Sequence, residues 1–213
     1  MQITPPSLPP LLTTVDNPSA LFEDEDSIEG VDVRDSFVMT DQLQKTSISE
    51  SLLSKIDFSQ VNAHRFDISD CALKNCNFTA SKFPDSSWHR VSIEGTRCSG
   101  LQVTNGTMKH VTFTNSKLEI VNFRFSRFEN VRFEDCVLDD VDFYEARLKN
   151  IEFVNCTINK MTFANASIVN VDISKSTVDT VIGIRSLRGV TISYDQLMQF
   201  APGFASEAGI KIK

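Results

Sequence analysis

The feature that most constrains the fold is a large apolar residue that returns every five residues. The segment VRFEDCVLDDVDFYEARLKN, residues 131–150, carries it at Phe133, Leu138, Phe143 and Leu148. A helical face repeats near 3.6 residues and a strand face repeats every two, so neither element explains a period of five. The period runs without insertion from Ile28 to Val178. A fixed short repeat of this length indicates a solenoid.

A second position, two residues before each of these centres, alternates between large and small side chains. In the middle of the repeat it is occupied by Val111, Ser116, Val121, Ser126, Val131 and Cys136. The true period is therefore ten, as expected if opposite sides of a four-sided coil share one kind of residue. Two residues after each centre, Asn, Asp or Gly is frequent, and these residues tolerate tight or left-handed turns. The pattern predicts a square coil of about twenty residues per turn.

These features resemble the pentapeptide-repeat family, in which a small residue, Asp or Asn, and Leu or Phe are followed by two polar positions. The units CNFTA, VDFYE, CVLDD and VDISK fit this pattern, and the resemblance covers residues 26–180. It implies an all-β solenoid, a right-handed quadrilateral parallel β-helix. We expect local irregularity in the N-terminal half, because Ala63 and Cys98 are small centres and Phe66 is a large second residue.

The chain divides into three regions. Residues 1–25 form a proline-rich, acidic leader that is expected to cover the first coil. Residues 26–192 form the repeat, and residues 193–213 form a short C-terminal helical cap and expected dimerisation element. Every solenoid needs such a cap over the open end of its core.

Within the C-terminal region, Ser193 is the expected helix N-cap. Pro202 is predicted to split the region into two short helices, and Gly209 is predicted to close the second one. The final IKIK alternates like a short edge strand.

The apolar residues of this tail admit two roles, capping alone or capping together with end-to-end dimerisation. The tail resembles the C-terminal helix of the gyrase-protecting, quinolone-resistance (Qnr-type) members, which dimerise through that element. The resemblance therefore implies a homodimer. The candidate residues are Leu197, Met198, Phe200, Phe204, Ile210 and Ile212.

Composition narrows the classes of partner and compartment. The net charge of −7 disfavours direct binding to nucleic acid or to an anionic membrane. No stretch approaches the roughly 18 apolar residues that a membrane helix needs. The start of the chain has no Lys or Arg before Arg34 and does not resemble a secretion signal. Five cysteines without a Cys-x-x-Cys pair argue against a disulfide framework and a zinc site, so we expect a cytoplasmic protein.

The sequence offers no catalytic constellation. The three histidines, His64, His89 and His110, all fall on outward positions, where solvated side chains are expected. Cys76, Cys136 and Cys156 fall on one side at the small inward position, where they serve as core residues. Adjacent carboxylates such as Asp139 and Asp140 lie on a flat ladder face without a cleft. We expect a protein that is not an enzyme and holds no cofactor or metal.

The resemblance implies one specific function, because several family members are rods that mimic duplex DNA and bind type II topoisomerases. A duplex as long as this rod, about 37 Å, carries roughly 22 charges. Residues 26–180 contain 22 acidic and 17 basic residues, so charge mimicry is restricted to local patches. The chain also lacks the projecting loops of many Qnr-type members. We expect DNA gyrase or topoisomerase IV as the partner, with a general scaffold or regulatory module as the alternative.

The candidate partner-binding residues combine acidic and aromatic side chains. They are Glu119, Asp139, Asp140, Phe125 and Tyr144. Glu119 and Asp139 fall one coil apart, and such a stack of like charges either serves a partner or is scattered surface charge. Phe125 occupies a corner, where it either contacts a partner or folds back along its own face while Arg124 stacks on Tyr144.

Overall fold

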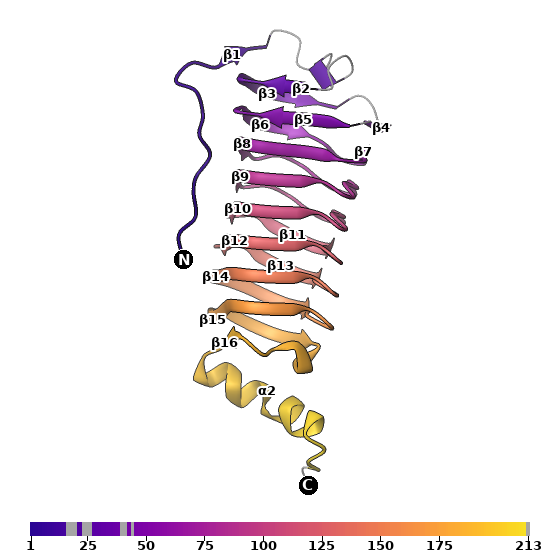
Figure 1. Ribbon diagram of the computed structural model, residues 1–213, viewed down its shortest axis with the longest axis vertical. Coiled ribbons are helices and arrows are strands. Elements are labelled where there is room, and N and C mark those ends of the chain that lie inside the picture. Colours follow the sequence, from indigo (N-terminus) through magenta and orange to yellow (C-terminus); the bar gives the residue numbers. More distant parts are fainter. Residues whose placement is uncertain (16–20, 23–26, 39–41, 44, 212–213) are drawn as a thin grey trace.

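The computed structural model describes residues 1–15, 21–22, 27–38, 42–43 and 45–211. It shows a parallel β-solenoid of about 8 turns, which confirms the predicted fold class. The coils are stacked along one rod, with a helix at the C-terminal end and an extended N-terminal segment along one flank (Figure 1).

The strands follow one another along the rod with short corners between them. They are β1 (Thr13–Thr14), β2 (Ser27–Glu29), β3 (Val31–Phe37), β4 (Gln42–Leu43), β5 (Thr46–Ser49), β6 (Leu52–Asp57), β7 (Asn62–Ala63), β8 (Phe66–Lys74), β9 (Ser87–Glu94), β10 (Thr107–Thr114), β11 (Lys117–Asn122), β12 (Arg127–Glu134), β13 (Val137–Asp142), β14 (Arg147–Thr162), β15 (Ser167–Ile182) and β16 (Val190–Thr191). A 3-10 helix, η1 (Ile184–Ser186), and the helix α2 (Tyr194–Glu207) complete the chain.

From β2 to β14 neighbouring strands pair in parallel with a register of twenty residues, as the repeat predicts, and the register shifts only at the two ends of the rod, where β1 pairs with β3 and where β15 pairs with β14 and β16. Met108 of β10 pairs with Phe128 of β12, for example, and Leu118 of β11 pairs with Leu138 of β13. Every fifth residue from 105 to 155 has a left-handed φ between 49° and 63° and forms a corner. Four corners per coil make the cross-section square.

Each coil therefore has four sides, called A to D here in chain order. In the middle of the rod the inward centres are Trp88, Met108 and Phe128 on side A, Ile93, Phe113 and Phe133 on side B, Cys98, Leu118 and Leu138 on side C, and Val103, Phe123 and Phe143 on side D. All of these side chains are buried, and equivalent rings stack from coil to coil. The ring of Phe133 lies 4.9 Å from that of Phe113 and 4.8 Å from that of Phe153, nearly parallel to both.

The alternation between large and small second residues has a hydrogen-bonding reason. Ser126, at a small position on side A, accepts a hydrogen bond from the Gly106 amide at 3.0 Å and donates one to the Val103 carbonyl at 2.7 Å. The hydroxyl thus satisfies backbone groups of the preceding coil that turn inward near a corner. Large residues such as Val121 and Val131 fill the two sides between.

The irregularity expected in the N-terminal half does not appear in the backbone of the described residues. Ala63, Phe66 and Cys98 are all buried, and Arg65 keeps the left-handed corner φ of 65°. Phe66 stacks on Phe83 with ring centroids 4.7 Å apart. Phe66 thus packs into the aromatic core together with Phe58 and Phe83, and Ala63 belongs to the same core cluster.

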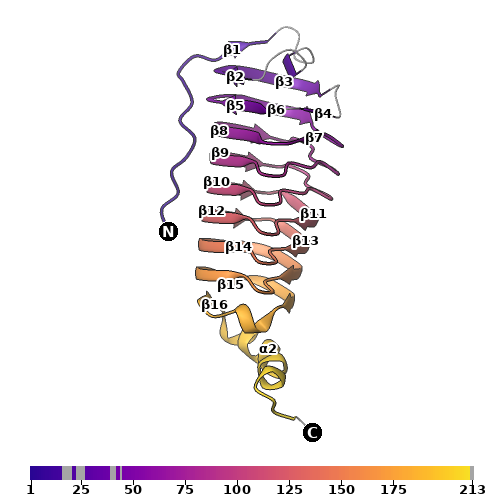
Figure 2. The same cartoon turned by 45° about the vertical axis from the view of Figure 1, so that its right-hand side comes forward.

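Apolar residues close both ends of the rod. At the N-terminal end Phe22 is buried and lies edge-on against Phe58, with ring centroids 5.5 Å apart. At the C-terminal end α2 covers the last coil, and Phe200 is only 6% exposed there. The leader does more than cover the first coil, because residues 1–15 also run along the flank (Figure 2).

Helix α2 confirms two expectations and corrects two others. Ser193 is the N-cap, and with Gln196 it forms a capping box. Pro202 lies inside one continuous helix, so the prediction of two short helices is wrong; its ring is exposed and only one helical hydrogen bond is lost. Gly209, with φ of 73°, ends the helix as predicted. Ile210 is not in a strand, and the end of the predicted edge strand lies outside the described residues.

Among the described residues, no helix has both the length and the apolar character required to cross a membrane.

Candidate protein-binding surface

The two aromatic candidates, Phe125 and Tyr144, are in contact. Their rings meet edge to face, with centroids 5.8 Å apart. The Arg124 guanidinium lies 5.6 Å from the centre of the Tyr144 ring, and its Nε donates to Asp142 Oδ2 at 2.7 Å. Phe125 thus folds back toward Tyr144 and still remains 47% exposed. The aromatic pair and Arg124 form a small ordered patch on side D.

Ile120 belongs to the same surface, although the candidate residues drawn from the sequence omit it. It occupies the corner between sides C and D with φ of 53° and is 71% exposed. Phe125 occupies the next corner, with φ of 63°. A left-handed φ is unfavourable for bulky and especially for β-branched residues. Side D of this coil is therefore bounded by two exposed apolar residues in strained conformations, and strain of this kind gathers at functional sites.

The acidic candidates lie on side C and its edge, and the structure pairs most of them with cations. Glu119 and Asp139 are register partners in β11 and β13, as expected. Lys117 Nζ lies 2.8 Å from Glu119 Oε1, and this hydrogen bond is the main cause that lowers the pKa of Glu119. Lys160 Nζ lies 2.9 Å from Asp140 Oδ1.

Asp139 alone of the three carboxylates has no ion pair with any residue that the structure describes. The stack of like charges between Glu119 and Asp139 is relieved because Lys117 neutralises one member. The five candidate residues thus form two groups on adjoining sides, an acidic one on side C and an aromatic one on side D. They meet at the corner that carries Ile120 and Asp140.

The histidines and cysteines show no reactive arrangement in the described part of the chain. His89 and His110 lie in adjacent coils with ring centres 6.1 Å apart, and no third ligand residue joins them there. All five cysteines are buried and free. Burial raises the pKa of Cys71 to about 12 and that of Cys76 to about 11, so both thiols stay protonated near neutral pH.

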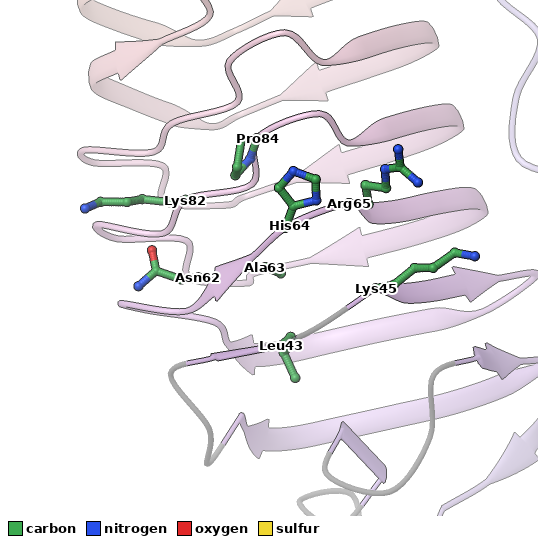
Figure 3. Close-up of a pocket in the computed structure, with 8 residues that line it drawn as sticks. All are labelled: Leu43, Lys45, Asn62, Ala63, His64, Arg65, Lys82 and Pro84. Atoms are coloured by element: carbon green, nitrogen blue, oxygen red, sulfur yellow. The ribbon is translucent and has the colours of Figure 1, made fainter.

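A basic hollow of about 570 Å³ lies on side D near the N-terminal end of the rod. Lys45, His64, Arg65 and Lys82 line it, and the sequence patterns did not single it out. Figure 3 shows the side chain of Lys82 pointing away from those of Lys45 and Arg65. His64 Nε2 lies 3.1 Å from Asp85 Oδ2. These charges do not converge on one point, so the hollow does not form an anion site.

The candidate dimerisation residues divide by exposure. Leu197, Met198 and Ile210 are 43%, 58% and 60% exposed, whereas Phe200 is buried and Phe204 is partly buried against the core. Ile212 lies outside the described residues. Tyr194, which the sequence reasoning missed, is 74% exposed near Leu197 and Met198 on α2. Phe200 therefore serves the cap, and the exposed residues are the ones available to a second rod.

A family model of the pentapeptide repeat region matches residues 66–135 and 126–181. This chain belongs to the pentapeptide-repeat family. A search among curated proteins finds no match.

Solved structures with the same fold include two trypsin-treated, singly substituted variants of QnrB1, described as a plasmid-mediated fluoroquinolone resistance protein. One variant is 15% identical with a TM-score of 0.50, covering 88% of this chain and 100% of that one. The other is 15% identical with a TM-score of 0.52, covering 95% and 97%. HetL, a pentapeptide-repeat protein involved in heterocyst differentiation regulation from the cyanobacterium Nostoc sp. strain PCC 7120, is 10% identical with a TM-score of 0.29, covering 79% and 90%. At 15% identity the likeness to the two QnrB1 variants concerns the fold.

Proposed function

We propose that this protein is a non-enzymatic, cytoplasmic interaction protein that binds a type II topoisomerase, DNA gyrase or topoisomerase IV, and modulates fluoroquinolone sensitivity. The observation that carries the proposal is the pair of strained, exposed corners, Ile120 and Phe125, on an uninterrupted rod. Bulky apolar residues at left-handed corners weaken folding, so a binding role is the simplest reason for them. QnrB1, which has a similar fold, is a fluoroquinolone resistance protein.

Charge alone does not carry this recognition. Lys117 and Lys160 neutralise Glu119 and Asp140, so the acidic group presents little net charge beyond Asp139. Contact through the shape of the rod and through Ile120, Phe125 and Tyr144 fits this surface better than broad electrostatic mimicry. The same ion pairs favour the second candidate, a scaffold or regulatory module that binds a different protein through side D.

We also propose that the protein is a homodimer joined through its C-terminal end. Tyr194, Leu197 and Met198 leave an apolar strip on α2 exposed, and Ile210 extends it beyond the helix. The strip lies at the end of the rod, where two rods can join without covering sides C and D (Figure 1).

The test is DNA supercoiling by purified gyrase with this protein titrated in, with and without a fluoroquinolone. We expect relief of drug inhibition, or direct inhibition, at low micromolar protein. The double substitution Ile120→Asn and Phe125→Asn should weaken the effect at least tenfold, because it removes the apolar corners. The matched control is Ala80→Asn, at an equivalent corner two coils away.

No effect of the folded wild-type protein in either arm would reject a topoisomerase role and leave the scaffold hypothesis. An equal effect of wild type and the double variant would show that side D is not the binding surface.

A further inference from the structure

The proline-rich N-terminal segment lies along side B of the rod. We call residues 1–12 the strap. The strap follows the flank of the coils from the level of β14 to β1 (Figures 1 and 2). Its less exposed residues recur every third position, at Ile3, Pro6, Pro9 and Leu12. Three residues per turn is the period of a polyproline II helix, so the strap presents one ridge of that helix to the rod.

The strap and the rod share a common register. The Thr4 amide donates to His110 Nδ1 at 3.1 Å, and the Ser7 amide donates to Asp70 Oδ1 at 3.0 Å. Three residues of polyproline II helix span about 9.3 Å. His110 and Asp70 lie two coils apart on one corner, which corresponds to about 9.6 Å. One turn of the strap therefore has the same length as two coils. The corner side chains of alternate coils are spaced to accept hydrogen bonds from every third amide of a polyproline II backbone.

The outward side chains of side B are small beneath the middle of the strap. Ala72, Ser92 and Thr112 occupy equivalent positions in three successive coils, and Ala72 is only 8% exposed beneath the strap. These residues form the floor of a shallow groove. Further along the same column, Arg132 and Glu152 form an ion pair with 2.7 Å between Nη2 and Oε2, and the amino group of Met1 lies 3.3 Å from Glu152 Oε1.

The strap fills this groove incompletely. A hollow of about 450 Å³ remains between residues 1–6 of the strap and the side chains of Ser92, Thr112 and Arg132. Ile3, the groove-facing residue at this level, is too small to fill that space. The opposite ridge of the strap leaves Leu8 and Leu11 37% and 87% exposed.

We propose that side B is a binding groove for a proline-rich, polyproline II segment of a partner protein, which carries a larger apolar residue at the place of Ile3. The strap occupies the groove in the absence of that partner. The register provides the hydrogen bonds, the small floor admits the backbone, and the hollow selects the larger side chain. Preformed polyproline II segments bind such grooves at a low entropic cost. This inference does not depend on the topoisomerase proposal, because it concerns a different side of the rod.

The test uses full-length variants and a peptide with the sequence of residues 1–12 that keeps a free amino terminus for Glu152 and carries its fluorophore at the C-terminal end. Substituting Ile3→Asp, Pro6→Asp and Pro9→Asp lifts the strap, because it places charges on the ridge that faces the groove. The matched control, Pro5→Asp, Leu8→Asp and Leu11→Asp, alters the exposed ridge and leaves the strap seated. We expect the peptide to bind the lifted-strap variant at least tenfold more tightly than it binds wild type or the control.

Two further peptides test the register and the hollow. A glycine inserted between Thr4 and Pro5 should weaken binding at least tenfold, because it breaks the match between three residues and two coils. Replacing Ile3→Phe in the peptide should strengthen binding several-fold. On the rod, Ser92→Arg in the lifted-strap background should abolish binding, whereas Gln102→Arg, ten residues along on side D, should not.

Absence of peptide binding to the folded lifted-strap variant would overturn the proposal, as would equal binding of the glycine-shifted peptide. If the native sequence binds at least as tightly as the Phe peptide, the groove is specialised for the strap itself. Dimers of wild type that disappear in the lifted-strap variant would replace the proposal with an exchange of straps between two copies.

Discussion

At the scale of single residues, each corner residue either tolerates the left-handed backbone and favours folding or provides an exposed side chain for contact with a partner. Asn occupies corners such as Asn105, Asn115 and Asn130, where its short polar side chain tolerates a left-handed φ. Ile120 and Phe125 hold the same backbone conformation without that tolerance. The cost of a left-handed φ is local, and each corner can be tested by one substitution.

Ile120→Asn should therefore raise the free energy of unfolding by about 1 kcal/mol, because Asn relieves the left-handed strain. The Ile120 side chain is exposed and is not part of the core, so the substitution removes no core contact. Urea unfolding followed by circular dichroism measures the change. Val137→Asn, an exposed apolar position outside a corner, is the control and should bring no gain. Equal gains in both variants would attribute the effect to lost surface apolarity instead.

At the scale of elements, the last coil and α2 meet through side-chain amides. Gln196 is 5% exposed, and its Nε2 donates to the carbonyls of Ile173 and Ser176, both at 2.8 Å. Gln199 Nε2 donates to the carbonyls of Val178 and Asp179. These are edge carbonyls of β15 that no further coil satisfies. The helix therefore covers the apolar core with Phe200 and completes the hydrogen bonds of the edge with its glutamines.

Gln196→Leu should lower the free energy of unfolding by about 2 kcal/mol, because it leaves two buried carbonyls without donors and removes half of the capping box. Gln196→Glu would leave the same carbonyls facing an acceptor and should be at least as harmful. Thermal unfolding measures both variants. Gln199→Leu, at a more exposed position, serves as comparison and should cost less. A harmless Gln196→Leu would show that apolar cover alone closes the rod.

At the scale of the whole molecule, two surfaces set how the rod associates and how it responds to pH. The end of the rod carries the exposed strip of Tyr194, Leu197 and Met198. Its flanks carry carboxylates that are paired with cations between coils, such as Asp70 with Arg90 and Glu129 with Lys149.

Met198→Glu should convert the proposed dimer to a monomer, since it places a charge in the centre of the apolar strip. Sedimentation velocity at micromolar concentration measures the change, and the unfolding of the monomer should remain unaffected because the Met198 side chain is largely exposed. Glu207→Ala, at the end of α2, is the control. A wild-type protein that sediments as a monomer would contradict dimerisation.

Acid should destabilise the rod. Hydrogen bonds from Arg90 lower the pKa of Asp70, and hydrogen bonds from Lys149 lower the pKa of Glu129. Because the folded pKa values lie below the unfolded ones, these groups stabilise the fold above about pH 5 and lose that contribution as the pH falls. The urea midpoint of the wild type should decrease as the pH is lowered from 7 to 3. The midpoint of the Asp70→Asn variant should decrease less steeply. A flat profile in wild type would contradict this assignment.

The amino-acid sequence alone determined the period of five, the square coil of twenty residues, the alternation of large and small inward residues and the N-cap at Ser193. These features repeat locally and depend only on neighbouring coils, so a single pattern specifies them.

The tertiary structure decided the rest. Phe66 is accommodated by stacking on Phe83, and Pro202 lies within one continuous helix on the end of the rod. The cations that neutralise Glu119 and Asp140 come from within the unit or one coil away, so geometry selects them. The strap could not be foreseen, because its match to side B joins residues 63 and 106 positions apart in sequence, and only folding brings such residues into contact.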